Sequence, residues 1–273
     1  MREVCSNAVV KNPVIRIGMI GTGLIAREHA LAISMIHGSA SLVAAADVVN
    51  EKLQTFCSFF GVPRRYETAV DLIADPEVDL VTITTPPSAH EELAVAALDA
   101  GRYVFCEKPL AHSVASAVRI VEAAERHPGR LAVSHQLRYD ASFRRLIWLC
   151  TNGWIGEVQS ALIERHSYIP HTSHGENGWW GLWKVAGGGV LMTQLIHELD
   201  LLLLAMGRPL SVSAAMDTCY TGIESEDYVE ATIRFAGEAA ARCIASVNSG
   251  RLGGNFTVQG SSGTVGLPWN FTT

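Results

Sequence analysis

Short apolar runs alternate with segments of helical spacing along the first half of the chain. The runs are β-branched and nearly continuous, which is typical of strands buried on both faces of a sheet. The intervening segments repeat apolar residues every three or four positions, and several end at glycine, as helices do. The expected strands cover residues 14–20, 41–47, 78–85, 102–107 and 130–135, and the expected helices cover 21–38, 51–61, 89–101 and 112–127. This alternation predicts βαβ units and a parallel, doubly wound sheet.

This rhythm is lost after about residue 135. A helix is expected over 140–152 and a strand over 157–169, followed by a Trp- and Gly-rich loop and a helix that begins near Gly187. The remaining segments alternate apolar and polar residues between turns, at 211–220, 227–236, 239–249, 255–261 and 263–269. They predict an antiparallel sheet with one face in water. We therefore expect two domains, 1–133 and 134–273.

Composition narrows the class of protein. Of the 273 residues, 48% are hydrophobic and 18% charged, which indicates a folded chain with a substantial core. The net charge is −6, and the sequence has no long block of basic residues, so no nucleic-acid partner is expected. The short basic cluster at residues 64–66 is interpreted as a solvated loop. The most apolar segment, near residues 199–206, is too short to span a bilayer, and no membrane partner is expected.

The cysteines and the N-terminal segment indicate a reducing compartment. The six cysteines are far apart and form no C-x-x-C pair, which favours neither a zinc site nor a disulfide framework. The first twelve residues lack the apolar stretch of a secretory signal. A cytoplasmic protein is therefore expected.

A glycine-rich turn, "GTGLIA" at residues 21–26, follows the first expected strand. Its first glycine permits a tight turn, its second lets the backbone approach a pyrophosphate, and Ala26 allows close packing of helix on strand. The N–H groups at the helix start then face the phosphates. The expected phosphate-binding residues are Gly21, Thr22, Gly23, Leu24 and Ile25.

Asp47 ends the second expected strand, where an acid can accept hydrogen bonds from ribose hydroxyls. The alternative for Asp47 is a helix cap. A carboxylate would also repel a 2′-phosphate, and residues 48–50 supply no cation to offset it. The predicted cofactor is therefore NAD, with NADP disfavoured.

Two further motifs follow apolar strands. "TTPPSAH", residues 84–90, stands where ligands bind in open α/β sheets, so Thr84, Thr85, Pro86 and His90 are expected to contact the cofactor. A strand-to-helix turn capped by Ser88 is the alternative. In "CEKPL", the Glu107–Lys108 pair could hold a cation at the crevice, although the residues alone favour a surface salt bridge.

The helix within "GGGVLMTQLIHELD" carries two faces. At about 100° per residue, Leu191, Leu195, Leu199, Leu202 and Met206 fall within an arc of roughly 80°. Thr193, His197, Asp200 and Leu204 fall in an opposite arc of roughly 60°. From this geometry alone the polar face is expected to be solvated.

Together these motifs resemble the glucose–fructose oxidoreductase, inositol dehydrogenase and MocA family. The order and spacing of "GTGLIA" with Asp47, "TPPSAH", "AGRYVFCEKPL", "WIGEV" and "GGGVLMTQLIHELDLLLLAMG" carry the resemblance over residues 14–265. It implies an N-terminal Rossmann domain and a C-terminal α/β domain with an open, largely antiparallel sheet. It also implies a homodimer or homotetramer, and oxidation of a sugar, cyclitol or related polyol with a nicotinamide cofactor.

The resemblance also implies roles for single residues. Lys108 matches a lysine that contacts cofactor and substrate, and His197 matches a general acid/base, so these two are the expected catalytic residues. Glu107 and Gln136 are expected near the cofactor, and Arg138 and Thr193 at the substrate. The chemistry suits them, because an imidazole can take the hydroxyl proton and an ammonium can stabilise charge that develops on oxygen.

The chain departs from the family pattern at Thr193, where many members carry an aspartate. Threonine cannot ionise, so the hydrogen-bonding pattern around His197 is expected to differ. Leu195 replaces a frequent glycine, and relatives often continue for tens of residues beyond Thr273. The loop before the site helix contains His166, His171 and His174, but their spacing does not predict a compact ligand set, and no metal is expected.

Three functions remain open from the sequence. The first is an NAD-dependent dehydrogenase acting on a secondary alcohol. The second is an NAD-dependent glycoside hydrolase or epimerase, in which oxidation is transient and no NADH is released. The third is a sensor that binds the dinucleotide without turnover, because a fold alone does not establish activity.

Overall fold

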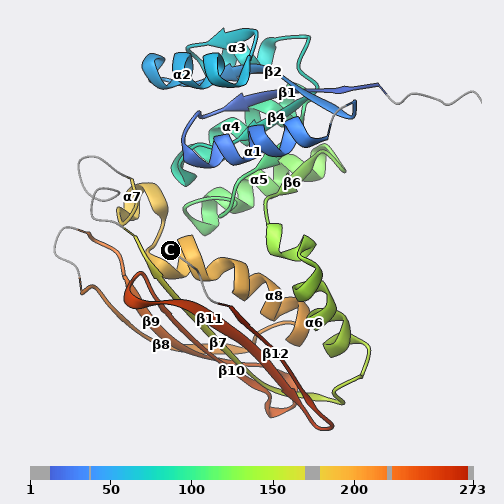
Figure 1. Cartoon of the computed structure of the whole chain (residues 1–273), viewed down its shortest axis with the longest axis vertical. Coiled ribbons are helices and arrows are strands. Elements are labelled where there is room, and N and C mark those ends of the chain that lie inside the picture. The colour runs from blue at the N-terminus through green and yellow to red at the C-terminus, as the bar shows by residue number, and fades with distance from the viewer. Residues whose placement is uncertain (1–12, 37, 170–178, 220–222, 270–273) are drawn as a thin grey trace, which may run out of the picture. The chain divides into compact units, whose positions relative to one another are not determined.

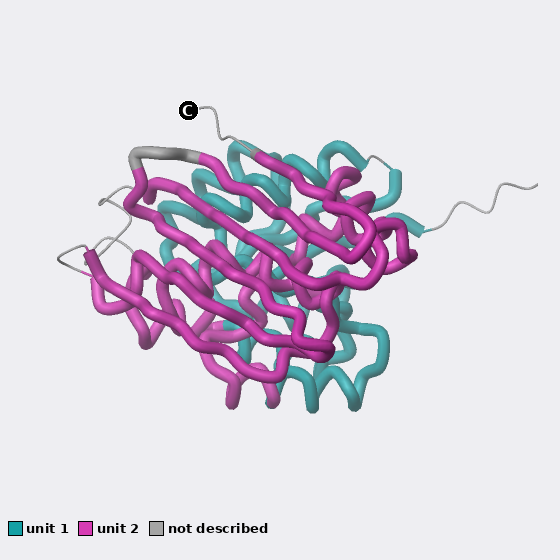
Figure 2. The backbone as a smooth tube through the Cα atoms, turned by 90° about the horizontal axis from the view of Figure 1, so that it is seen from below, with its two compact units in different colours: residues 1–85, 90–107, 119–132 teal, residues 86–89, 108–118, 133–273 magenta. Residues whose placement is uncertain are grey.

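The structure of the protein, a computed structural model, describes residues 13–36, 38–169, 179–219 and 223–269. The chain divides into two compact units, coloured separately in Figure 2. Unit 1 contains Met1–Thr85, His90–Glu107 and Arg119–Ala132, and unit 2 contains Pro86–Ala89, Lys108–Val118 and Val133–Thr273. Two short segments of the first half of the chain therefore belong to unit 2, and the expected limits 1–133 and 134–273 stay a prediction.

Unit 1 is a doubly wound α/β fold, as the sequence predicted. Its strands are β1 (Ile15–Ile20), β2 (Ala40–Ala46), β3 (Arg64–Tyr66), β4 (Leu80–Ile83), β5 (Tyr103–Cys106) and β6 (Leu131–Val133). They lie in the order β3-β2-β1-β4-β5-β6, and β1 pairs in parallel with both β2 and β4. The order reverses at β1, so the switch point where such folds bind ligands lies beyond the carboxyl ends of β1 and β4.

The helices of the first half are α1 (Leu24–Met35), α2 (Asn50–Phe60), α3 (Ala69–Ala74), α4 (His90–Asp99) and α5 (Val114–Arg126). Met19 of β1 and Ala45 of β2 share one core cluster with Leu53 and Phe56 of α2. On the other face, a Cβ added to Gly18 would lie 2.7 Å from a side-chain carbon of Leu72 in α3. Because both faces are covered, the strands of this sheet read as continuous apolar runs.

The sequence-based expectation was wrong at residues 64–66. This segment is not a solvated loop but the edge strand β3, which pairs in parallel with β2. Its three residues carry no apolar run, because an edge strand of this length buries little surface. The short helix α3 that follows was not predicted either; it is only six residues long and is capped by the Thr68 hydroxyl, which accepts from the Asp71 N–H.

Unit 2 contains a second sheet and the helices that lie on it (Figure 1). Its strands are β7 (Val158–Tyr168), β8 (Ser211–Asp217), β9 (Tyr228–Arg234), β10 (Ala240–Ser246), β11 (Asn248–Gly260) and β12 (Thr264–Trp269), in the order β12-β11-β7-β10-β9-β8. All described pairings are antiparallel except β7 with β10, which is parallel. The expectation of an open, largely antiparallel sheet is confirmed, and the sheet is mixed.

Two long helices, α6 (Ala141–Thr151) and α8 (Ile196–Met206), lie along one face of this sheet (Figure 1). Residues from both helices and from the inward face of the sheet form a single core, to which Leu146 of α6, Leu201 of α8 and Phe256 of β11 belong. Alternate strand residues that point away from the helices are polar or half-exposed. The predicted sheet with one wet face is therefore present.

The helix α8 is the last part of a longer helical stretch, Trp183–Met206. Judged only by its length and composition, this stretch could cross a membrane. This stretch is longer than the apolar segment expected at residues 199–206. Within the part of the chain that the structure describes, 44% of its most apolar window is buried, and Leu195, Leu201 and Leu202 belong to the core of unit 2. It therefore serves as the core helix of this unit.

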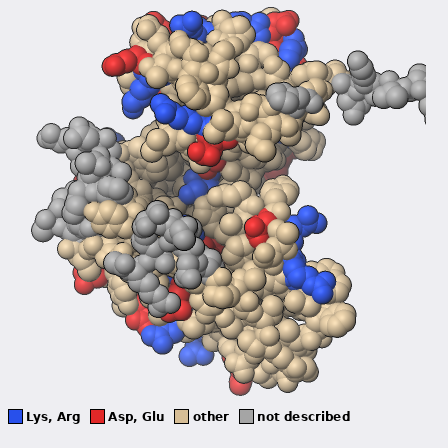
Figure 3. Space-filling model, in the orientation of Figure 1, with Lys and Arg blue, Asp and Glu red and all other residues tan. Residues whose placement is uncertain are grey.

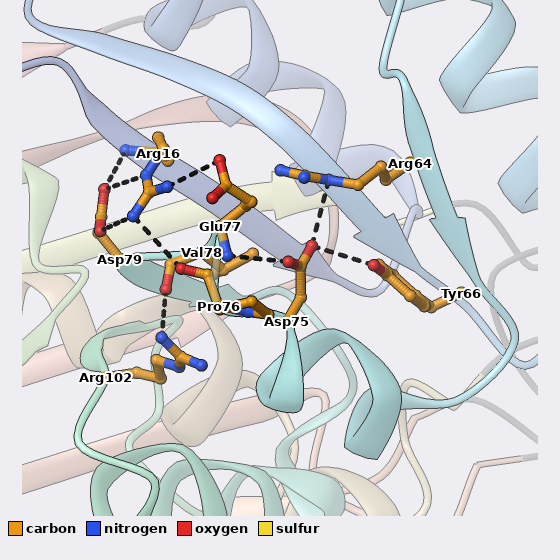
Figure 4. A network of polar contacts seen from close by, with 9 residues as sticks. All are labelled: Arg16, Arg64, Tyr66, Asp75, Pro76, Glu77, Val78, Asp79 and Arg102. Carbon is orange, nitrogen blue, oxygen red and sulfur yellow. Dashed lines mark hydrogen bonds and ion pairs between the residues drawn. The ribbon is translucent and has the colours of Figure 1, made fainter.

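Charged side chains of both signs are interspersed on the face drawn in Figure 3. A group of charged side chains ties the amino ends of β1 and β4 together (Figure 4). Arg16 donates from its guanidinium to both carboxylate oxygens of Asp79, over 2.9 and 2.7 Å, and its backbone N–H donates to the same carboxylate over 2.9 Å. Glu77 pairs with Arg16 over 2.8 Å. These hydrogen bonds from Arg16 lower the pKa of Asp79 to about 2.

Asp79→Asn should therefore reduce stability in a pH-dependent way. A carboxyl whose pKa falls on folding stabilises the fold above its unfolded pKa of about 3.9, and this contribution is lost as pH falls through the folded pKa of about 2. Urea denaturation of wild type and variant should differ at pH 7 and converge toward pH 2. Glu77→Gln, at a more exposed pair, should change stability little. An equal loss for Asp79→Asn at both pH values would contradict this assignment.

Candidate functional site

The glycine turn after β1 is built as the sequence predicted. Gly21 has a φ of +91°, and a Cβ there would lie 2.9 Å from the carbonyl carbon of Thr84. Only glycine fits both this conformation and this approach. Thr84 completes the turn from the neighbouring strand end, because its buried hydroxyl contacts the carbonyl oxygens of Ile20 and Gly21 over 3.0 and 2.8 Å. Thr84 therefore supports the turn.

The helix α1 begins at this turn with an open N-terminus. Gly23 is its N-cap, no side chain caps it, and no acid stands in its first turn. A Cβ added to Gly23 would meet no atom within 4 Å. Backbone N–H groups at such an end attract phosphate through hydrogen bonding and the helix dipole. Leu24, the first helical residue, is 85% exposed. This arrangement fits the pyrophosphate of a dinucleotide.

Asp47 follows β2 and is held by the glycine turn. Its Oδ2 accepts from the Thr22 N–H over 2.8 Å and from the Thr22 hydroxyl over 2.7 Å, and its Oδ1 accepts from the Val49 N–H over 2.8 Å. A carboxylate has about four acceptor positions, and three are filled. Asp47 thus closes a short turn through Val49, although no side chain caps α2, and it has room for one further donor, which fits a ribose hydroxyl. Its contact with the cofactor stays a prediction.

The end of β4 presents a buried hydroxyl without a hydrogen-bond partner among the described residues. This group is Oγ1 of Thr85, whose carbonyl oxygen lies 2.9 Å from Nε2 of His90. His90 is fully buried, so its ring holds the loop. A buried hydroxyl without a partner is uncommon in proteins and fits a position where a ligand supplies the partner.

Glu107 lies at the end of β5 and is only 6% exposed. Its Oε1 lies 2.7 Å from Nε2 of His29 on α1. Glu107 is therefore buried and not part of the surface salt bridge that the residues alone favour. Lys108, the next residue, belongs to unit 2 and contacts Thr193 there.

The site helix of unit 2 starts with a widened turn. Residues Leu191–Leu195 form a π-helical turn, η5, and α8 follows without a break. Such turns are rare and are frequently found at functional sites. A wheel at 100° per residue does not describe this turn, and the polar face is not solvated as that wheel suggested. Thr193 is 3% exposed and His197 is 6% exposed.

Lys108 is anchored on this turn. Its ammonium nitrogen Nζ donates to the main-chain carbonyl of Thr193 over 2.8 Å. The two expected catalytic residues therefore meet the same short helical stretch, because His197 lies four residues, about one turn, after Thr193. The sequence separation between lysine and histidine hides this proximity.

Thr193 uses its hydroxyl within the protein. Oγ1 donates to the carbonyl of Gly189 over 2.7 Å and accepts from the indole Nε1 of Trp180 over 3.0 Å. Because a hydroxyl has one donor, this donor is already engaged. A direct contact of Thr193 with substrate stays a prediction.

His197 has a second histidine beside it. The rings of His135 and His197 are nearly perpendicular, with centroids 6.4 Å apart. Nδ1 of His135 lies 3.7 Å from Oδ2 of Asp200, and Arg138 forms a two-pronged pair with the same carboxylate over 2.6 and 2.5 Å. The hydrogen bond to Asp200 raises the pKa of Arg138. Asp200 thus contacts both Arg138 and His135, the histidine beside His197.

The start of the site helix is capped by a residue from another segment. The Glu226 carboxylate accepts from the N–H groups of Gly189 and Leu191 over 2.9 and 3.1 Å, and its main-chain carbonyl accepts from Val190 over 2.9 Å. A Cβ at Gly189 would lie 1.7 Å from that carbonyl, which explains one glycine of the triplet. The cap satisfies N–H groups that a buried helix start would otherwise leave without partners.

A buried ion pair fixes the other side of the helix. Arg165 of β7 donates from Nη1 to Oε1 of Glu198 over 2.6 Å and from Nη2 to the side-chain oxygen of Gln194 over 3.3 Å. Arg165 therefore bridges the π-helical turn and the first turn of α8. Burial raises the pKa of Glu198, and Arg165 opposes this shift.

The structure brings together some predicted residues and adds others. Lys108, Arg138, Thr193 and His197 lie on or against one helix within unit 2, while Gly21, Thr22, Asp47 and Thr84 lie around one turn of unit 1. Gln136 opens the exposed turn before α6, and its role stays a prediction. Glu226 and Arg165 were missed as site residues. Asp200 had a signal in the sequence as part of the polar arc.

The described residues contain no group of three or more His, Cys, Asp or Glu side chains that could hold a metal ion. His166 lies in β7, whereas His171 and His174 lie outside the described residues.

Two family matches cover most of the chain. Residues 15–135 match the family described as "Oxidoreductase family, NAD-binding Rossmann fold", and residues 143–266 match "GFO/IDH/MocA C-terminal domain". Inositol 2-dehydrogenase of Acidothermus cellulolyticus is 30% identical over 260 residues, which are 93% of this chain and 72% of that protein. Inositol 2-dehydrogenase 3 of Saccharopolyspora erythraea is 35% identical over 162 residues, 59% of this chain and 48% of that protein. The alignment thus spans about half the length of the second relative.

Solved structures with the same fold include two dehydrogenases. The WlbA dehydrogenase from Bordetella pertussis, in complex with NADH and UDP-GlcNAcA, is 29% identical with a TM-score of 0.88, covering 94% of this chain and 78% of that chain. A probable dehydrogenase from Thermotoga maritima is 28% identical with a TM-score of 0.81, covering 93% of this chain and 76% of that chain.

Glu226→Gln should destabilise unit 2. An amide has one acceptor oxygen, so the N–H of either Gly189 or Leu191 loses its partner, which costs about 1–3 kcal/mol for a buried group. Urea denaturation measures this loss. Glu224→Gln makes the same chemical change on an exposed neighbour and should cost clearly less. Equal losses of unfolding free energy in the two variants would show that the buried cap contributes no more to stability than the exposed neighbour does.

Proposed function

The chain belongs to the GFO/IDH/MocA family of oxidoreductases with the NAD-binding Rossmann fold, and on this premise we propose that it is an NAD-dependent dehydrogenase. Its substrate is a secondary alcohol of a sugar, cyclitol or related polyol. The names of the relatives support this class, because the two sequence relatives are inositol dehydrogenases and WlbA was solved with a nucleotide sugar acid.

One observation carries the proposal. The Lys108 ammonium is fixed on the Thr193 carbonyl, one helical turn before His197. Dehydrogenation of an alcohol needs a cation that stabilises the oxygen as it loses its proton, and a base that takes this proton. The cation Lys108 contacts the helical stretch that carries the base His197, and both belong to unit 2.

The residues of unit 1 fit the cofactor. The open start of α1 at Gly23 would hold the pyrophosphate, Asp47 a ribose hydroxyl, and Oγ1 of Thr85 a further polar group. NAD, when bound, accepts a hydride from the carbinol carbon. Lys108 orients the hydroxyl and stabilises negative charge on its oxygen, and His197 takes the hydroxyl proton. The alcohol thereby loses one hydride and one proton and becomes a carbonyl compound.

The proposal includes a cytoplasmic homodimer or homotetramer. The edge strand β8 supports assembly, because all its residues are exposed and Val212 and Met216 are 68% and 57% exposed. Unpaired strand edges with apolar side chains are common sites of association.

A substrate panel tests the function. Sugars, sugar acids and inositols are each supplied with NAD, and the absorbance of NADH is followed together with substrate conversion. A dehydrogenase forms NADH and carbonyl product in equal amounts. Conversion without net NADH would assign an epimerase or hydrolase with transient oxidation, and tight NAD binding without conversion of any substrate would assign a sensor.

His197→Ala should lower kcat by about 10²–10⁴-fold, because the proton of the hydroxyl then has no positioned acceptor. The dissociation constant of NADH should change little, since the residues that fit the dinucleotide lie in unit 1. Steady-state kinetics and NADH fluorescence titration measure the two quantities. His127→Ala, at a histidine paired with Asp99 in unit 1, serves as the matched control. Unchanged turnover in His197→Ala would remove this assignment.

Wild type should bind NADH more tightly than NADPH, because the Asp47 carboxylate repels a 2′-phosphate. Asp47→Asn keeps the size of the side chain but removes its charge, and should narrow the preference by about tenfold or more. Fluorescence titration with both cofactors gives the ratio. Glu51→Gln neutralises a nearby exposed acid on α2 and should leave the ratio unchanged. Tighter binding of NADPH by wild type would show that Asp47 does not select the cofactor.

A further inference from the structure

Thr193 stands at the centre of a buried hydrogen-bond group in unit 2. Its hydroxyl joins Gly189 at the start of the site helix to the indole of Trp180, and its carbonyl receives the Lys108 ammonium. Thr193 and Trp180 are 3% and 6% exposed. Trp180 and Lys108, which lie 13 and 85 residues away in the sequence, therefore both contact Thr193.

The carbonyl of Thr193 belongs to the π-helical turn and accepts a hydrogen bond from the Lys108 side chain. In a regular α-helix each main-chain carbonyl accepts from the N–H four residues later. A widened turn interrupts this ladder, so that a carbonyl can accept from a side chain. Leu191–Leu195 is such a turn, and Thr193 lies at its middle. The position of the Lys108 ammonium thus depends on the shape of this turn.

We propose that Thr193 is a positioning residue, whose hydroxyl locks the π-helical turn so that its own carbonyl holds the Lys108 ammonium at the reacting oxygen. The proposal rests on the dehydrogenase function. It assigns the hydroxyl to Gly189 and Trp180, and the substrate to Lys108 and His197.

The choice of a carbonyl has a chemical consequence. A carboxylate beside the ammonium would neutralise much of its charge. A carbonyl dipole fixes the ammonium without itself carrying a net charge, and the ammonium can then stabilise the negative charge that develops on the alcohol oxygen. Threonine is suited to this task, because its hydroxyl can donate to one group and accept from another while adding no charge.

Three variants separate the elements of this arrangement. Thr193→Val has nearly the same shape but lacks the hydroxyl, whereas Thr193→Ser keeps the hydroxyl and serves as the matched control. Trp180→Phe keeps an aromatic ring but lacks the indole N–H that donates to Thr193. Circular dichroism and thermal melting verify that each variant is folded.

The first readout uses the protein without cofactor or substrate. A small amine-reactive acylating reagent labels lysines, and mass spectrometry compares Lys108 with the exposed Lys52 and Lys184. Thr193→Val should raise the relative labelling rate of Lys108 severalfold, because the turn is no longer locked and the main-chain carbonyl that accepts from the ammonium loses its fixed position. Thr193→Ser should label as wild type does. No increase in the valine variant would overturn the proposal.

The second readout is steady-state kinetics on the substrate that the panel identifies. Thr193→Val should lower kcat by about tenfold or more, because both hydrogen bonds of the hydroxyl that lock the turn are lost, with KM nearly unchanged. Thr193→Ser should restore kcat. A higher KM with unchanged kcat in the valine variant would instead make Thr193 a substrate ligand and overturn the proposal.

Trp180→Phe provides an independent arm. It should lower kcat less than Thr193→Val does, and it should add nothing when combined with Thr193→Val, because both changes remove the same contact. Additive losses would contradict a shared role. If wild type converts no substrate, the dehydrogenase function fails, while the labelling of Lys108 still decides the role of Thr193.

Discussion

The buried polar face of the site helix is the constraint around which unit 2 is arranged. A buried polar group without a partner costs about 1–3 kcal/mol, so each group on this face requires a partner from elsewhere in the unit. The helix start is satisfied by Glu226, the Thr193 hydroxyl by Trp180, and the Thr193 carbonyl by Lys108. Arg165 serves the far side. These partners come from separate segments, so the site acquires its geometry only when those segments have folded around the helix.

Much of the fold could be predicted because its signals are local. Strands β1, β2, β4 and β5 are apolar runs buried on both faces, and the doubly wound sheet follows from their alternation with helices. The structure departs from prediction where little surface is buried or where pairing is long-range. Residues Arg64–Tyr66 lack an apolar run, and nothing in the sequence distinguishes the parallel pair of β7 and β10 from its antiparallel neighbours.

The same distinction separates the predicted from the unpredicted parts of the site. The glycine turn could be recognised because Gly21 and its helix are contiguous, and Asp47 follows the next strand. The burial of Thr193 could not be predicted, because a helical wheel assumes a uniform rotation per residue and takes no account of partners. The π-helical turn violates the first assumption. The wheel also omits the partners of this helix, because Trp180 and Glu226 lie 13 and 37 residues away from the groups they bind.

The distribution of charge along the helix bears on how such a site functions with threonine where an acid often stands. The two described acids of this helix stretch nearest to His197, Glu198 and Asp200, are each engaged by an arginine, Arg165 and Arg138. Each of these negative charges is therefore balanced by a positive one. The Lys108 ammonium is held by a neutral carbonyl. Under the proposed chemistry, the positive charge of the lysine stabilises the alkoxide that forms on the substrate, and this is the charge that the transition state needs.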